Sequence, residues 1–211
     1  MIGKRLGPLL WFLSIQYYVV QVLVALDWAK PYSLARNTIS DLANTHCGLY
    51  GSKFVCSPLH GVMNTSFVVL AITMLLGALL IGKRLATNAV SALGFIFIAL
   101  AGIGNLLVGL FPENTVSSLH ILGAALTFVF GNVGMLILGL SLTQKIPKSV
   151  RLYTLFSGCV GLVALGLFMS RHYLGIGIGG MERFTAYPQS IWMTIFGIYL
   201  LVTSSRGKTT K

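Results

Sequence analysis

Long apolar runs separated by short polar segments form the dominant pattern of the chain. Six runs approach the length of about 20 residues that a helix needs to cross the hydrocarbon core of a bilayer. They are apolar on every side and do not alternate with a period of two, which favours helices over barrel strands. We therefore expect an all-α fold, one bundle of six transmembrane helices over residues 1–211. The predicted spans are about 6–26, 59–82, 89–110, 119–142, 152–172 and 187–204.

The distribution of lysine and arginine predicts how this bundle is oriented. With six alternating spans, one side of the membrane carries ten of the fifteen basic residues and the other side carries five. Short loops rich in Lys and Arg stay cytoplasmic, so we expect both termini to be cytoplasmic and the long loop 27–58 to be extracytoplasmic. The ten are Lys4, Arg5, Lys83, Arg84, Lys145, Lys148, Arg151, Arg206, Lys208 and Lys211; the five are Lys30, Arg36, Lys53, Arg171 and Arg183.

Composition supports a membrane setting. Hydrophobic residues make up 55% of the chain and charged residues only 9%, whereas a soluble domain carries about 25% charged residues. Such a chain cannot cover a water-facing surface, which argues against a soluble enzyme, a disordered chain and a nucleic-acid-binding module. The formal charge of +11 is mostly a topology signal. We expect membrane lipids as partners, with a membrane partner subunit as a further option, and no nucleic acid.

Residues that can act as acids, bases or ligands gather on the predicted extracytoplasmic side, which holds all four acids and all four histidines. His60 and Asn64 are four residues apart and share one face of their helix. Charged groups at membrane depth need partners, and the nearest partners are each other. Arg183 is the expected bridge, since its fork can bind two carboxylates or a phosphate. The predicted ligand-binding cluster is Asp41, His60, Asn64, Asn105, Glu113, His120, Glu182 and Arg183.

Two cysteines in the long loop, Cys47 and Cys56, predict a disulfide. Their spacing closes a small ring, and an extracytoplasmic loop allows oxidation. Two free thiols are the alternative. A metal site would need two further ligands, so no metal is assigned.

Several short stretches, taken in order, resemble one known family. They are Asn37 to Leu42, Cys56-Ser57-Pro58, Met63-Asn64, Gly102 to Gly109, Phe111-Pro112-Glu113, His120 and Gly180-Met181-Glu182-Arg183. Together they resemble the family catalogued as domain of unknown function 998, which is similar in plan to the Frag1/DRAM/Sfk1-like group of six-helix membrane proteins. The resemblance implies the fold and the membrane setting over nearly the whole chain, but no chemistry.

Four functions remain open, of which a transporter has the least support because the sequence shows no internal inverted repeat. The first is a membrane protein whose outer polar pocket binds a lipid head group, a small ligand or a partner subunit. The alternative is an intramembrane enzyme acting on a lipid-like substrate at the outer leaflet, with Asp41, Glu113, His120 and Glu182 as acids and bases. Ser40 beside Asp41 is not a nucleophile signature, because neighbours in sequence rarely face each other. The third is a haem or metal protein that uses His60 and His120. The sequence does not identify a cofactor.

Overall fold

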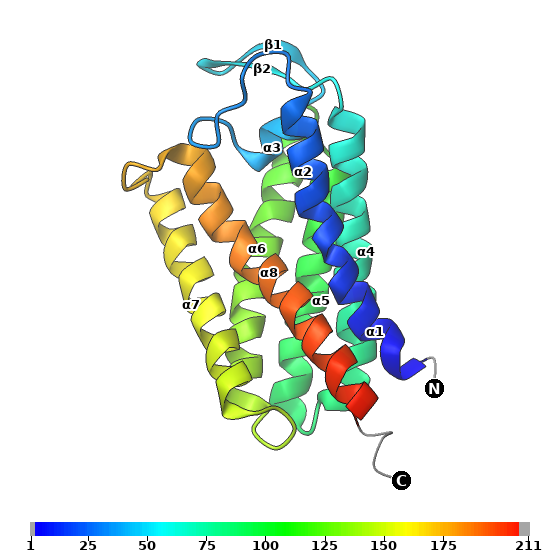
Figure 1. Cartoon of the computed structure of the whole chain (residues 1–211). Helices are drawn as coiled ribbons and strands as arrows, with labels where there is room; N and C mark the ends of the chain where they lie inside the picture. The colour runs from blue at the N-terminus through cyan, green and yellow to red at the C-terminus, as the bar shows by residue number, and fades with distance from the viewer. Residues whose placement is uncertain (1–2, 207–211) are drawn as a thin grey trace.

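The chain forms a bundle of long helices with a small cap at one end (Figure 1). The computed structural model describes residues 3–206. The first long segment consists of α1 (Gly3–Phe12), the 3-10 turn η1 (Leu13–Ile15) and α2 (Gln16–Leu26). The remaining long helices are α4 (His60–Leu85), α5 (Ala89–Leu110), α6 (Ser117–Ser141), α7 (Lys148–Met169) and α8 (Gly177–Arg206).

Five segments of the described chain are long and apolar enough to cross a membrane, and each coincides with a predicted span. They are Arg5–Leu26, His60–Leu85, Ala89–Leu110, Ser117–Ser141 and Lys148–Met169. The sixth predicted span, 187–204, lies within α8, which begins at Gly177. The chain is therefore a helical membrane protein with several spans.

The early start of α8 has a specific cause in tertiary contacts. A side chain on Gly177 would place its Cβ 2.2 Å from the Ala35 carbonyl oxygen, and one on Gly179 would lie 2.1 Å from that of Asn37. The Gly179 amide donates to the Ala35 carbonyl at 2.9 Å. Glycine is a poor helix former, but here it lets the first turn of α8 press against the loop after α2.

The helices close into a ring. Following the chain from α4 to α8, each helix packs on the next, and α1 then contacts both α8 and α4. The approach of α5 to α6 is especially close, because a Cβ on Gly104 would lie 2.5 Å from the Gly123 carbonyl oxygen. Small residues allow such backbone contact between membrane helices.

An aromatic cluster joins the first and last helices. The Trp11 ring lies 5.1 Å from that of Trp192 and 5.8 Å from that of Phe196, measured between centroids. Its indole nitrogen donates to the Met74 carbonyl at 3.3 Å, which attaches α1 to α4 as well. Burial of these large rings stabilises the centre of the bundle.

The outer surface of the bundle is apolar. On α7, more than half of the surface of four large hydrophobic side chains is exposed, namely Leu152, Phe156, Val163 and Met169. Soluble proteins rarely expose apolar patches of this extent. Acyl chains are the environment that such a surface requires.

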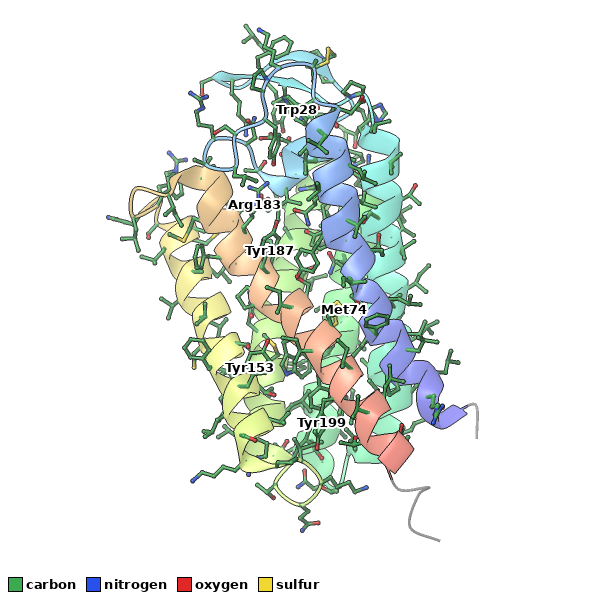
Figure 2. The ribbon with its side chains drawn as sticks, in the orientation of Figure 1. Trp28, Met74, Tyr153, Arg183, Tyr187 and Tyr199 are labelled. Carbon is green, nitrogen blue, oxygen red and sulfur yellow. A yellow bond between two sulfur atoms is a disulfide. The ribbon has the colours of Figure 1, made fainter. Side chains whose placement is uncertain are left out.

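The cap consists of the chain between α2 and α4. It contains α3 (Ile39–Leu42) and an antiparallel hairpin of β1 (Cys47–Tyr50) and β2 (Lys53–Cys56). Cys47 pairs with Cys56 in the hairpin register, and their sulfurs form a disulfide, visible at the upper tip in Figure 2. The predicted disulfide is confirmed. The cap lies at one end of the bundle, whereas α1 begins and α8 ends at the other (Figure 1).

Candidate functional site

The candidate site lies where α3 meets α6 and α8. Helix α3 has only four residues, and a capping box fixes its start. The Thr38 hydroxyl accepts the Asp41 amide at 3.1 Å, and the Asp41 carboxylate accepts the Thr38 amide at 2.8 Å. At the other end, the Ser57 hydroxyl donates to the Leu42 carbonyl at 2.7 Å. These bonds fix the short helix in place over the bundle.

Asp41 is fully buried and forms an ion pair. Its Oδ2 lies 2.5 Å from the Lys53 ammonium of β2. Lys53 thus neutralises the acid of α3, and the sequence pattern gave no reason to select this residue among the fifteen lysines and arginines.

Glu182 reaches α3 from the first turns of α8. One carboxylate oxygen accepts the Ile39 amide, and the other accepts the Ser40 hydroxyl at 3.1 Å. Only 6% of the Glu182 surface is exposed. A buried carboxylate is tolerated when such donors satisfy it, so Glu182 fixes the position of α3 relative to α8.

Ser40 also contacts His120 on α6. The Ser40 Oγ lies 3.1 Å from His120 Nε2, and His120 Nδ1 lies 3.0 Å from the Phe111 carbonyl oxygen. A carbonyl oxygen can only accept a hydrogen bond, so the proton of the imidazole is assigned to Nδ1. In a neutral imidazole, Nε2 is then an acceptor that faces the serine hydroxyl.

Glu113 joins the same region from the loop before α6. Its carboxylate accepts the Asn44 side-chain amide at 2.8 Å, and its carbonyl accepts the Tyr50 hydroxyl at 3.1 Å. Burial, followed by the nearby negative charge of Asp41, raises the Glu113 pKa from 4.5 to about 8. The Asn44 bond acts in the opposite direction. At pH 7 Glu113 is therefore mainly protonated.

Arg183 does not make the predicted bridge between carboxylates. Its Nη1 donates to three carbonyls, those of Leu34 at 3.1 Å, Asn37 at 2.9 Å and Gly179 at 2.8 Å. Its Nη2 donates to the Tyr32 hydroxyl at 2.5 Å. The side chain lies near the upper end of α8, just below the cap (Figure 2). Because the loop after α2 turns its carbonyls inward, this arginine serves as their common donor.

The remaining predicted residues lie at different depths. Asn64 donates to the Ala43 carbonyl at 2.9 Å and holds the cap to α4. Asn105 is buried deeper, with its amide 3.5 Å from the Met74 sulfur. His60 begins α4, and no hydrogen bond in the described part of the chain joins its ring to the cluster. The structure thus brings together Asp41, Glu113, His120 and Glu182, with Asn64 and Arg183 holding the surrounding loop.

A cavity of about 520 Å³ opens beside this cluster. Its polar end includes Ser40, Lys53, Glu113, His120 and Glu182. The rest is apolar and follows α6 and α7, with Ile121, Ala125, Phe128, Leu165 and Phe168 among its lining residues. Its volume falls in the range of about 300–1,000 Å³ that is typical of small-molecule sites.

A second cavity, of about 40 Å³, shares part of its lining with the first. Ser40, His120 and Glu182 line both cavities, and Asn105 and Gln189 line only the smaller one. Met74, which also lines it, lies at mid-depth of the bundle in Figure 2. One water needs about 10–15 Å³ measured in this way, so the smaller cavity has room for a few waters.

Sequence reasoning set Ser40 aside and left it out of the predicted cluster, although its contacts are the most informative in the site. The serine is separated from His120 by 80 residues and from Glu182 by 142. Its immediate neighbour Asp41 turns away to Lys53. The available signal was only that Ser40 lies within Asn37–Leu42, one of the stretches that carry the family resemblance. Across residues 3–206, no group of three or more His, Cys, Asp or Glu is arranged to hold a metal ion.

Comparison with known proteins gives one match. The model of a family described as protein of unknown function (DUF998) matches residues 12–199. No curated protein and no solved structure matches the chain.

Proposed function

The chain belongs to the DUF998 family, and from its site we propose that it binds one amphipathic lipid in the 520 Å³ cavity. The lipid head group would lie against α3, and an acyl chain would lie along α6 and α7. In this proposal the protein has six spans, with α8 as the last, and the cavity opens toward the outer leaflet.

The observation that carries the proposal is the division of the cavity into a polar and an apolar part. Hydroxyl, carboxyl and imidazole groups gather at the end beneath the cap, whereas the walls formed by α6 and α7 are aliphatic or aromatic. A wholly polar ligand would leave the apolar walls unfilled, and a hydrocarbon would leave the polar groups unpaired. An amphipathic lipid satisfies both parts.

The charge of the lining favours a head group with hydroxyl or ester groups. Lys53 is already paired with Asp41 at 2.5 Å. The raised pKa of Glu113, about 8, leaves its carboxyl mainly neutral at pH 7. Arg183, a suitable phosphate ligand by type, is committed to backbone carbonyls and Tyr32. The site therefore lacks a free cation suited to a phosphate, and we name a diacylglycerol-like lipid as its ligand class.

The proposed orientation rests on charge and on the position of the chain ends. Ten basic residues lie in or beside the predicted cytoplasmic segments and five lie on the other side; Lys208 and Lys211 are outside the described residues. Helix α1 begins and α8 ends at the end remote from the cap (Figure 1), as an even number of spans requires. Reporter fusions at the C-terminus and within the β1–β2 turn should give opposite sides. A C-terminal reporter outside the cell would refute this orientation.

Native mass spectrometry can test lipid binding. The protein is placed in phosphatidylcholine nanodiscs with added dioleoylglycerol, and bound lipid is counted after release. Ala125→Trp introduces a large ring into the apolar part of the cavity and should reduce retained diacylglycerol at least tenfold. Leu76→Trp, on the exposed surface of α4, is the control and should retain it. Equal retention in the two variants would contradict the proposed site.

A further inference from the structure

We propose that Ser40 is a nucleophile and His120 its general base, so that the protein cleaves an ester bond of the lipid it binds. This inference rests on the proposed lipid-binding function and adds a reaction to it. The arrangement that carries it is one hydroxyl, one imidazole and one orienting carbonyl at the polar end of the 520 Å³ cavity.

The three groups are placed as nucleophilic catalysis requires. Ser40 Oγ is 3.1 Å from His120 Nε2, within the range for proton transfer. A third group must orient the base, and here the Phe111 carbonyl holds Nδ1 at 3.0 Å. The Ser40 side chain reaches this position because α3 is fixed by its capping box and by the Ser57 bond to Leu42.

Ser40 is accessible as well as paired. It is only partly buried, whereas Ile39 and Asp41 on either side of it are buried. Its position on the wall of the large cavity exposes the hydroxyl to a lipid whose ester group lies between head group and acyl chain. A nucleophile at the boundary between the polar and apolar parts of the cavity is therefore at the depth of the ester.

Glu182 is a positioning residue in this arrangement. It accepts the Ser40 hydroxyl at 3.1 Å and the Ile39 amide, and so holds the serine in reach of His120. The single Ser40 proton has two acceptors, Glu182 and His120, and attack requires its transfer to His120. We expect Glu182→Gln to change the pH profile of the reaction, because it removes one titrating acceptor of that proton.

The reaction balances with water as the only co-reactant. Ser40 Oγ attacks the ester carbonyl carbon while its proton passes to His120 Nε2. The carbon–oxygen bond to the alcohol then breaks, and His120 returns the proton to the departing alkoxide, which leaves an acyl ester on Ser40. A water attacks this ester as His120 takes its proton. The proton returns to Ser40 Oγ as the carboxylic acid leaves.

The smaller cavity offers a route for that water. Ser40 and His120 line it from one side and Asn105 and Gln189 line it deeper in the bundle. Its volume of about 40 Å³ has room for a few waters. Acyl chain and water would thus reach the same serine through separate cavities.

An alkyl fluorophosphonate tests the nucleophile directly in the full-length protein in nanodiscs. Attack of Ser40 Oγ on phosphorus forms a P–O bond and breaks the P–F bond, with the proton leaving through His120. Intact mass should show one adduct, and fragmentation should place it on Ser40. Because the adduct is located in the unmodified sequence, this result does not depend on whether a Ser40 variant folds.

Variants then test the roles. Ser40→Ala should lose the adduct, and His120→Gln should slow its formation about 100-fold or more. The matched control is Ser170→Ala, because Ser170 also lies 3.1 Å from a histidine nitrogen, that of His172, but on an exposed loop. This variant should be labelled at the wild-type rate.

Native mass spectrometry of the same samples separates this inference from the binding proposal. Retained diacylglycerol without an adduct on Ser40 would overturn the nucleophile and leave lipid binding standing. Failure of Ser40→Ala, which cannot cleave the ester, to retain diacylglycerol would overturn the binding proposal itself. An adduct on Ser170, or on Ser40 at an unchanged rate in His120→Gln, would also overturn the assigned roles.

Discussion

Glu113 should make the fold less stable as pH rises. Burial raises its pKa from 4.5 to about 8, so between these values the folded state binds a proton that the unfolded state has released. The number of bound protons is then larger in the folded state, and the free energy of unfolding falls with increasing pH. The stabilisation is complete below pH 4.5 and is lost as pH passes 8.

The size of the effect follows from the same pKa values. A difference of 8 − 4.5 = 3.5 units corresponds to about 5 kcal/mol at 1.36 kcal/mol per unit, and partial exposure makes this an upper limit. The groups facing Glu113 are the Asn44 amide, the Asp41 carboxylate and the Tyr50 hydroxyl, and Lys53 is paired with Asp41. The negative charge of Glu182 adds to the rise in the Glu113 pKa.

Glu113→Gln isolates this contribution. The amide preserves an oxygen that can accept from Asn44 but removes the titration. Thermal unfolding midpoints are measured in detergent from pH 5 to pH 8 for both proteins. We expect the midpoint of the wild type to fall relative to that of Glu113→Gln as pH rises. Asp27→Asn, which removes an exposed carboxyl at the same end, is the control and should follow the wild type. Parallel curves for wild type and Glu113→Gln would refute the reasoning.

Three further predictions concern the framework. Gly104→Ala should lower the free energy of unfolding by about 1–3 kcal/mol, because its Cβ would lie 2.5 Å from the Gly123 carbonyl oxygen. Gly166→Ala is the control and should leave stability unchanged, because nothing lies within 4 Å of its Cβ. Similar thermal shifts in the two variants would contradict this prediction. Cys47→Ser opens a small disulfide ring and should lower the free energy of unfolding by about 2–3 kcal/mol. In thermal unfolding, the variant should lose as much stability as the wild type loses when reductant is added. Arg183→Lys loses the planar fork whose Nη1 reaches backbone carbonyls and whose Nη2 reaches the Tyr32 hydroxyl, and it should speed proteolysis of the cap. Unchanged cleavage would refute this prediction.

The helices were largely predictable because their signal is local. A run of about 20 apolar residues has few alternatives to a membrane helix, and all five segments that meet this criterion match predicted spans. The disulfide was predictable for a similar reason, since Cys47 and Cys56 are close in sequence and lie in one loop. The start of α8 could not be predicted from the sequence, because contacts of Gly177 and Gly179 with the loop after α2 override the low helix propensity of glycine.

The site was predictable in part. The acids and His120 could be placed at one end of the bundle by counting spans, and they do lie there. Which side chains pair could not be deduced. Arg183 turns to carbonyls instead of carboxylates, and Ser40 turns to His120 and Glu182. Both outcomes depend on how α3 docks on α6 and α8, which is long-range geometry that no local pattern encodes.

Mapping a photoreactive lipid tests the central claim most directly. Diacylglycerol with a diazirine in one acyl chain is added to nanodiscs, activated with light and located by peptide mass spectrometry. We predict crosslinks concentrated at residues that line the apolar part of the cavity on α6 and α7, namely Ile121, Ala124, Ala125, Phe128, Val129, Leu165, Phe168 and Met169. These crosslinks should be lost in Ala125→Trp. Crosslinks spread evenly over the exposed apolar surface, with no change in Ala125→Trp, would contradict a lipid site in this cavity.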